Sequence, residues 1–304
     1  MKSRKDLISE LKGLQTESKS DHYPGLDSLT PEQGIELFVQ DYLDYLPVIL
    51  TRKAIISNVI LEAKSRIKSQ NKIVYTGAGT SGRLGILDAS ECPPTFGVDS
   101  TVFVGIIAGG ETAIRNAVEG AEDNEEMGIE DYSTAGILVS DLLIGITASG
   151  RTPYVMAQLK LHHALGGKTV LIICNEKPEG SYPFVDYLID LNVGKEILTG
   201  STRLKSGSLT KIILNLISTL SMTQVGKVWG NYMVDLKATN EKLKARAVKT
   251  FIEITGESFE TAESFLQKSD FQLKTALVMF YKSCGKDQAA LFISEADGQL
   301  KNLL

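Results

Sequence analysis

The chain has 304 residues, 43% of them hydrophobic, and its 32 lysines and arginines against 37 aspartates and glutamates give a formal net charge of −5. This composition is typical of a soluble globular protein with a substantial core. The acidic balance argues against a nucleic-acid partner, which needs a basic surface, and no stretch reaches the ~20 apolar residues of a membrane span.

Helical signals come first along the chain. Thr30 and Pro31 predict a helix that starts at Pro31, because threonine can cap a helix and proline suits the first helical position. A second helix is predicted over roughly residues 50–69. We expect residues 1–50 to form an N-terminal helical segment.

Five short apolar runs follow, and each is typical of a buried β-strand. They end in glycine-rich turns and alternate with helical patterns, as in a parallel sheet that helices cover on both faces. The runs are 72–79, 101–110, 142–150, 168–175 and 187–193. We therefore predict a doubly wound α/β domain with a parallel five-stranded sheet at residues 51–238.

Helices are predicted for the rest of the chain. Leu209, Ile213 and Leu220 belong to an apolar series at helical spacing, which indicates a long buried helix after Gly200 and no further strand. Short helices follow from about residue 240, with breaks at Gly256, Ser269–Asp270, Gly285 and Gly298. Residues 239–304 are expected to form a small helical C-terminal subdomain.

The cysteines indicate the compartment. Cys92, Cys174 and Cys284 are far apart and form no CxxC pair, so neither a zinc ribbon nor a disulfide framework is expected. The first residues, MKSRKDLISELKG, lack the apolar core of a secretory signal. Both observations favour a cytoplasmic protein.

Histidine is equally scarce, with three in the chain. His162 and His163 are neighbours, and on a helix their side chains point about 100° apart, so they cannot bind one metal ion together. We interpret them as a solvent-facing pair and expect no metal and no cofactor. Any acid–base chemistry is then expected to use carboxylates.

Two of the predicted strands end in turns that are rich in hydroxyl groups and glycine. Each turn lies between a strand and a helix, where free backbone N–H groups and the positive end of the helix dipole favour an anion. A third turn of this kind precedes the long helix and adds two cations, Arg203 and Lys205, either of which suits a phosphate or a carboxylate. The candidate binding residues are Gly79, Thr80, Ser81, Gly82, Arg83, Ser149, Gly150, Arg151, Thr152, Ser201, Thr202 and Lys205.

Two other interpretations of these turns stay open. Gly77, Gly79 and Gly82 match the G-x-G-x-x-G dinucleotide motif, but the second strand ends without the acidic residue that such a site needs. Two compact hydroxyl-rich turns also suit a phosphate better than a pyrophosphate. Ser81 and Thr152 are, in addition, suited to cap the helices that follow them.

Taken in order, the turns resemble the sugar isomerase (SIS) domain, a phosphosugar-binding α/β fold. Five longer segments narrow the resemblance to the N-acetylmuramic acid 6-phosphate etherase family, and it runs through most of the chain. The sequence departs from the family at residues 194–196, Gly-Lys-Glu, where Gly-Pro-Glu is frequent. The segments are 77–97, 107–123, 148–154, 198–207 and 230–243.

This resemblance implies a metal-free lyase of amino-sugar catabolism and peptidoglycan recycling that forms a homodimer. The family converts N-acetylmuramic acid 6-phosphate into N-acetylglucosamine 6-phosphate and D-lactate, by elimination and then addition of water. It implies that Glu91 is the proton donor to the departing lactate and that Glu122 is the base at C2. We expect Glu91 to lie in a partly desolvated pocket, because an acid needs a raised pKa. Without the resemblance, both glutamates suit an exposed helix surface.

The placement of these carboxylates raises a geometric question. If residues 81–91 form one helix, Glu91 lies about 15 Å along the axis from Ser81, and Glu122 is expected to lie similarly far along its own helix. Either the helix breaks early, as Pro93–Pro94 suggests, or a second subunit completes the site. We favour the shared site.

Two other functions use the same fold. A non-catalytic phosphosugar-sensing regulatory protein would bind its ligand through the same turns, without turnover. An aldose–ketose isomerase would also carry them, although the segment DASECPPTFG at residues 88–97 disfavours it. Release of lactate would distinguish the etherase from both.

Overall fold

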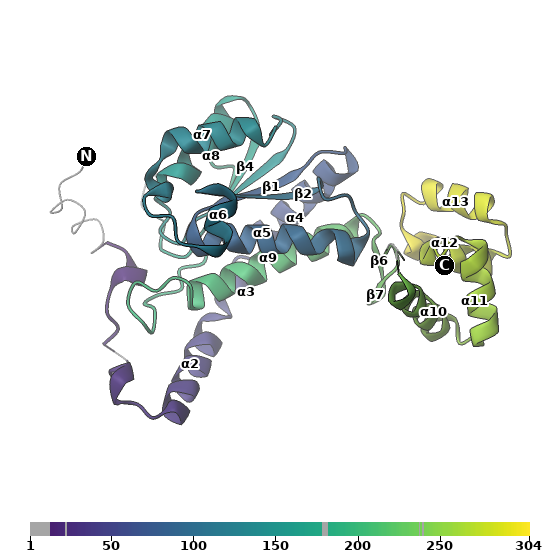
Figure 1. The fold of residues 1–304 in the computed structure, drawn as a ribbon, viewed down its shortest axis with the longest axis horizontal. Helices are drawn as coiled ribbons and strands as arrows, with labels where there is room; N and C mark the ends of the chain where they lie inside the picture. The colour runs from purple at the N-terminus through teal and green to yellow at the C-terminus, as the bar shows by residue number, and fades with distance from the viewer. Residues whose placement is uncertain (1–12, 22, 178–181, 237, 239) are drawn as a thin grey trace. The chain divides into compact units, whose positions relative to one another are not determined.

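The computed structural model describes residues 13–21, 23–177, 182–236, 238 and 240–304 (Figure 1). It divides into two compact units. The first, here the sheet unit, comprises Met1–Ser90 and Thr101–Ile217. The second, here the helical unit, comprises Glu91–Ser100 and Ser218–Leu304.

Residues 1–12 of the segment expected to be helical lie outside the described residues, and its described part contains helices. After the short 3-10 helices η1 (Gln15–Glu17) and η2 (Leu26–Ser28), helix α2 begins at the predicted residue. Thr30 caps it by accepting a hydrogen bond from the Gln33 N–H, and the Gln33 side chain accepts one from the Thr30 N–H. The predicted second helix is α4, and it begins three residues later than expected. The helices are α2 (Pro31–Tyr45), α3 (Val48–Thr51) and α4 (Lys53–Lys68).

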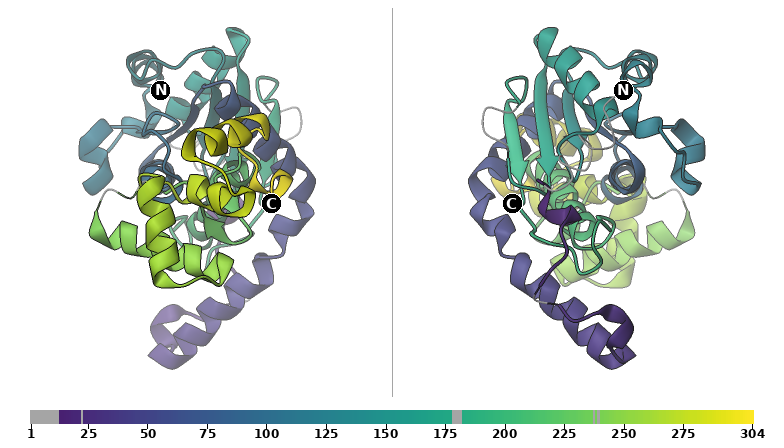
Figure 2. Two further views of the ribbon diagram at one scale, coloured as in Figure 1. Left: turned by 90° about the vertical axis from the view of Figure 1, so that its right-hand side faces the viewer. Right: turned by 90° about the vertical axis from the view of Figure 1, so that its left-hand side faces the viewer.

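The predicted five-stranded parallel sheet is confirmed. All five apolar runs form strands, in the order β2-β1-β3-β4-β5, and every neighbouring pair is parallel. Strands β1 and β3 are buried along their whole length, which explains why their sequences are continuously apolar. The strands are β1 (Ile73–Gly77), β2 (Phe103–Ile107), β3 (Leu142–Ile146), β4 (Lys168–Ile173) and β5 (Tyr187–Asp190), seen from two further sides in Figure 2.

Helices cover both faces of the sheet. In Figure 1, α7 and α8 lie above the strands and α5 lies below them. Helix α5 comes so close that a Cβ on Gly85 would lie 2.8 Å from the Tyr75 Cβ. On the other face, Leu159 of α8 packs with Leu143 and other strand residues in one buried cluster. The helices are α5 (Gly79–Phe96), α6 (Gly110–Arg115), α7 (Glu125–Thr134) and α8 (Pro153–Ala164).

The strand order creates a crevice at the carboxyl edge of the sheet. From β1 the chain crosses to β2 on one side, whereas from β3 it crosses to β4 on the other. The turns after β1 and β3 therefore diverge, and ligands of open α/β sheets bind at such a switch point. Gly77 and Ile146 are register partners at the ends of these strands, so both turns start at the same level.

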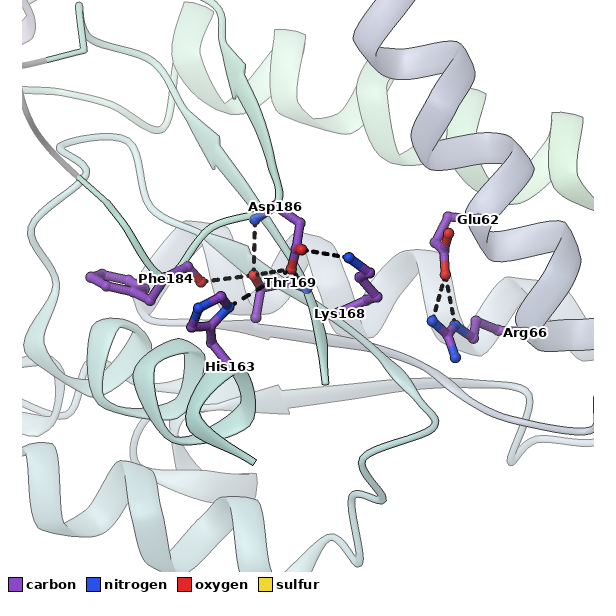
Figure 3. Close-up of polar contacts among 7 residues, drawn as sticks. All are labelled: Glu62, Arg66, His163, Lys168, Thr169, Phe184 and Asp186. Carbon is purple, nitrogen blue, oxygen red and sulfur yellow. Dashed lines mark hydrogen bonds and ion pairs between the residues drawn. The ribbon is translucent and has the colours of Figure 1, made fainter. Parts of the chain in front are cut away.

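The opposite end of the sheet has a polar cluster that joins strands (Figure 3). The Asp186 carboxylate accepts hydrogen bonds from the Lys168 Nζ at 2.7 Å and from the Thr169 N–H at 2.9 Å. Desolvation acts to raise the pKa of Asp186, but these donors outweigh it and hold the pKa below its usual value. The neighbouring Arg66–Glu62 pair is an ion pair within α4. This cluster lies at the starts of β4 and β5, away from the crevice.

The histidine pair corrects one interpretation. His163 is exposed, as expected, but His162 is fully buried. Its Nδ1 lies 2.8 Å from the Tyr132 hydroxyl and its Nε2 lies 3.3 Å from the Asp141 carbonyl oxygen. Burial lowers the pKa of His162, so its role in the fold is that of a neutral, hydrogen-bonded core residue.

Helix α9 (Lys205–Gln224) is the predicted long helix, and Leu209, Ile213 and Ile217 are buried on it. The expectation that no strand follows it is wrong, because β6 (Val228–Trp229) and β7 (Tyr232–Met233), each two residues long, form an antiparallel hairpin. Such short strands leave little sequence signal. Among the described residues, no helix has both the length and the apolar character required to cross a membrane.

In its described residues, the helical unit contains four further α-helices, which contribute to one apolar cluster. Phe251 is buried in it, and Phe265 and Phe280 pack against it, with ring centroids 5.5–5.8 Å apart. Helix α10 ends at Gly256 and α13 starts after Gly285, at two of the predicted breaks. The helices are α10 (Glu241–Thr255), α11 (Phe259–Lys268), α12 (Leu273–Lys282) and α13 (Lys286–Glu295), followed by η4 (Leu300–Asn302).

Candidate active site

A cavity of about 1060 Å³ lies at the carboxyl edge of the sheet, where the crevice was expected. All three hydroxyl-rich turns contribute to it, so segments that are far apart in sequence meet there. Its polar lining includes Glu17, Gly79, Thr80, Ser81, Glu122, Asp123, Thr147, Ser149, Arg151, Thr152, Gly200 and Thr202.

The first turn joins β1 directly to α5. The helix starts at Gly79, so Thr80 and Ser81 lie in its first turn, where backbone N–H groups have no partner within the helix. These N–H groups and the two hydroxyls line the cavity at the positive end of the helix dipole. The arrangement is that of an anion site.

The second turn follows β3 and contains a connected set of hydroxyls. The hydroxyl oxygens of Thr147 and Thr152 are 2.7 Å apart, and the Ser149 hydroxyl accepts a hydrogen bond from the Arg151 N–H. Thr152 precedes α8 but makes no side-chain capping bond. Capping therefore does not explain this threonine, which lines the cavity instead.

The third turn corrects the prediction for Lys205. Thr202 lines the cavity, but Lys205 is fully buried away from it. The Lys205 Nζ lies 2.7 Å from Asp41 Oδ1 of α2 and donates to the Lys195 carbonyl at 2.9 Å. The Glu196 carboxylate accepts hydrogen bonds from the backbone N–H groups of Lys205 and Ser206. The start of α9 is thus already satisfied by an anion from the chain itself.

Arg83 also has a structural partner in place of a ligand. Its guanidinium donates to the carbonyl oxygens of Ile114 and Asn116, at 3.0 and 2.9 Å, and so holds the end of α6. It lines a smaller neighbouring cavity of about 130 Å³, which Glu122 also borders. Three further predicted residues are absent from the described lining of the large cavity, namely Gly82, Gly150 and Ser201.

Glu122 lies in the cavity, which overturns the expectation that it sits far along a helix. Helix α6 ends at Arg115, and the chain turns back through the short helix η3 (Ala121–Asp123). Although Glu122 is exposed as a residue, desolvation is the largest cause that raises its pKa, and the charges of Asp123 and Glu119 add to it. A carboxylate with a raised pKa is a stronger base than an ordinary glutamate.

Glu91 is different, because it lies on the exposed surface of α5. The expected partly desolvated pocket is therefore wrong for a single chain. The early helix break is wrong as well, since α5 continues through Pro93 and Pro94 to Phe96. Glu91 is not among the described residues that line the cavity, and it lies about 15 Å along the axis from Ser81.

Sequence reasoning missed the contribution of the N-terminal segment. Thr16 and Glu17 of η1 line the cavity together with Leu14, which precedes that helix. They stand in a mixed polar stretch without periodicity or motif, so no local signal identifies them. Among the described residues, no group of three or more histidine, cysteine, aspartate or glutamate side chains is arranged to hold a metal ion.

The fold defines a class, the SIS-type α/β domain. A family model described as the glucokinase regulatory protein N-terminal SIS domain matches residues 55–163. Residues 246–287 match a model of a UBA-like domain. The solved structure of a candidate phosphosugar isomerase involved in capsule formation, from Bacteroides fragilis, is 20% identical, with a TM-score of 0.44 over 64% of this chain and 91% of that one.

Curated relatives identify the family within this class. An N-acetylmuramic acid 6-phosphate etherase of Francisella philomiragia is 42% identical over 97% of this chain and 100% of its own length. Etherases of Geobacillus thermodenitrificans and Rhodopirellula baltica are 41% and 40% identical, over 97% and 98% of this chain and 99% and 98% of their own lengths. The chain belongs to the N-acetylmuramic acid 6-phosphate etherase family. Neither a regulatory protein nor an isomerase is favoured.

Proposed function

We propose that this chain is a lyase that cleaves the D-lactyl ether of N-acetylmuramic acid 6-phosphate, giving N-acetylglucosamine 6-phosphate and D-lactate. The observation that carries the proposal is that Glu122 and the phosphate-type turns after β1 and β3 line one cavity. In the described part of the chain, Cys92, Cys174 and Cys284 form no disulfide bond, in keeping with the cytoplasmic location that we propose. The role we propose for the reaction there is peptidoglycan recycling.

The two turns would hold the phosphate. Backbone N–H groups and hydroxyls of Thr80, Ser81, Ser149 and Thr152 provide neutral donors, and Arg151 provides a cation on the same cavity. A phosphate held there places the rest of the sugar in the remaining space of the cavity. Arg83 would support this site by holding the backbone at the end of α6, and Lys205, which is buried away from the cavity, would take no part in binding.

Glu122 would act as the base. In the open-chain sugar the C1 aldehyde acidifies the proton on C2, and the Glu122 carboxylate accepts that proton. The C2 electron pair forms a C2–C3 double bond while the C3–O bond breaks, with its electron pair on the lactate oxygen. Water then adds its hydroxyl to C3, and a proton returns to C2. The sum is one water consumed and one lactate released.

The proton for the lactate oxygen would come from Glu91 of a second copy of the chain. Glu91 is exposed on α5 and outside the cavity of its own chain, whereas the same surface is free to meet another copy. The active form we propose is a homodimer in which each site combines Glu122 of one subunit with Glu91 of the other.

Mixing two inactive variants tests this arrangement. Random pairing of Glu91→Gln and Glu122→Gln chains makes about half of the dimers mixed, each with one intact site, so about one quarter of wild-type activity should return. Each variant alone serves as the control. If both glutamates act within one subunit, no site is intact, and verified mixed dimers would stay inactive.

Release of D-lactate from N-acetylmuramic acid 6-phosphate by the purified chain tests the function itself. We expect stoichiometric lactate and N-acetylglucosamine 6-phosphate, with turnover lost in Glu122→Gln. A protein that binds the substrate without releasing lactate would be a sensor, and one that alters the sugar without releasing lactate would be an isomerase. Either result would refute the proposal.

A further inference from the structure

The N-terminal segment Leu14–Glu17 forms one wall of the proposed active site. It contains η1, and three of its residues line the same cavity as Glu122 and the phosphate-type turns. Leu14 and Thr16 are buried, whereas Glu17 is half-buried and borders the cavity. A segment that merely crossed the surface would not contribute buried residues at both of these positions.

Asn175 attaches this segment to the site. It follows β4, is 2% exposed, and accepts a hydrogen bond from the Thr16 N–H while its own Nδ2 donates to the Thr16 hydroxyl at 3.0 Å. The same Nδ2 donates to the Ala148 carbonyl at 2.9 Å, within the turn after β3. One buried amide therefore joins the N-terminal segment to a phosphate-type turn. Since buried polar groups are costly unless paired, this junction fixes the relative positions of both.

Gly200 holds the segment from the other side. Its N–H donates to the Thr16 carbonyl at 2.9 Å, and its φ of +77° is in the region that favours glycine. A Cβ on Gly200 would lie 2.9 Å from the Glu17 Oε2, so the absence of a side chain leaves the space that this carboxylate occupies. The position of Glu17 is thus determined by contacts on both sides.

The carboxylate of Glu17 has no hydrogen-bond or ion-pair partner within the described part of the chain, although it borders a cavity whose other walls carry donors. Its charge repels both anionic ends of the proposed substrate, the phosphate and the lactyl carboxylate. The part of the substrate that Glu17 can contact favourably is therefore the middle of the sugar, which presents hydroxyl groups and an acetamido N–H. A carboxylate accepts strong hydrogen bonds from such neutral donors.

We propose that Glu17 binds the substrate by accepting hydrogen bonds from hydroxyl or acetamido N–H groups of the sugar, and that Thr16 and Asn175 position it. This inference rests on the proposed function for the identity of the sugar. It gives Glu17 a binding role that is separate from the proton transfers of Glu122 and Glu91.

Substitutions at Glu17 test the binding role by two measurements. We expect Glu17→Ala to lower kcat/KM for lactate release by about 10- to 150-fold, the range for one hydrogen bond to a charged group, and to weaken calorimetric binding of N-acetylglucosamine 6-phosphate by a similar factor. Glu17→Gln retains an acceptor oxygen and should lose less. Inhibition by inorganic phosphate, which has no sugar donors, should stay within twofold, as should all values for the matched control Glu36→Gln on α2.

Thr16→Val tests the positioning. It removes the hydroxyl that Asn175 contacts and keeps the backbone N–H, so it should weaken sugar binding in the wild-type background and change little when Glu17→Ala is already present. Equal losses in both backgrounds would show a purely structural role and refute positioning. Urea unfolding of each variant verifies that it is folded.

The outcomes separate this inference from the proposed function. If the wild type releases lactate and Glu17→Ala matches it in rate and sugar affinity, the role of Glu17 is refuted and the function stands. If the wild type releases none, the function fails, and the calorimetric arm still decides whether Glu17 contacts the sugar phosphate. Loss of one limb of the pH profile in Glu17→Gln would make Glu17 an acid–base group and overturn the binding role.

Discussion

Lys205 offers a direct test of structure against sequence pattern, because the sequence predicts a phosphate ligand and the structure shows a buried ion pair. The side chains of Lys205 and Asp41 are fully buried, and the Lys205 Nζ also lies 3.6 Å from the centroid of the Tyr45 ring. Asp41 Oδ1 accepts a second hydrogen bond from the Tyr23 hydroxyl, whereas its Oδ2 has no partner among the described residues.

The substitution Lys205→Met keeps the length of the side chain and removes the charge. It leaves the buried Asp41 carboxylate without its cation, and breaking one half of a buried pair costs about 3–5 kcal/mol. The free energy of unfolding, measured by urea titration, should fall by that amount. Adding Asp41→Asn removes the stranded charge, so the double variant should recover part of the loss.

The same variants are assayed for inhibition of lactate release by inorganic phosphate, at a temperature where all are folded. We expect an unchanged inhibition constant, because Lys205 does not reach the cavity. A Lys205→Met protein that loses less than about 1 kcal/mol of stability, well below the cost of breaking a buried pair, but binds phosphate much more weakly would refute the structural role.

Two pH-dependent predictions follow from the shifted pKa values. Protonation of Glu122 removes the proposed base, so kcat/KM should fall on the acid side with an apparent pKa above that of an ordinary glutamate. The variant Glu122→Gln should lose about 10²- to 10⁴-fold in kcat/KM. The variant Glu119→Gln should move the acid limb to lower pH, because it removes one cause of the raised pKa of Glu122. An unmoved limb would contradict this assignment. The depressed pKa of His162 means that the unfolded chain binds a proton that the folded chain excludes. The free energy of unfolding should therefore fall below pH ~6.5 by up to about 1.4 kcal/mol per pH unit. In His162→Gln this part of the pH dependence should be absent. Equal slopes of unfolding free energy against pH in the wild type and in His162→Gln would contradict the prediction.

The sheet and its two phosphate-type turns were predictable because their signals are local. A parallel strand that is buried on both faces must be apolar at every position, as β1 and β3 are. Glycine and hydroxyl residues directly after such strands then mark the carboxyl edge, where an anion meets helix N-termini. Family resemblance added the roles of particular glutamates, which spacing alone does not distinguish from surface residues.

Long-range partners account for most of the errors. Nothing near Lys205 in the sequence reveals that its charge pairs with Asp41, or that Glu196 already satisfies the start of α9. Two helices also differ in length from the expectation, since α6 is shorter and α5 is longer. Helix α6 stops at Arg115 and lets Glu122 return to the cavity, whereas α5 accommodates Pro93 and Pro94, each at the loss of one helical hydrogen bond.

The anchoring of the cavity walls explains how segments from so many parts of the chain can act as one site. The turns after β1 and β3 start at one level because the strands are in register, so a phosphate bound as we propose would be fixed relative to the sheet. Arg83 holds the end of α6, from which the chain leads to Glu122, and it does so from the helix whose first turn lines the cavity. Asn175 likewise joins the segment of Glu17 to the turn after β3. Both carboxylates are therefore tied to the elements for which we propose phosphate binding. A phosphate bound there would set the distance from the sugar to the proposed base.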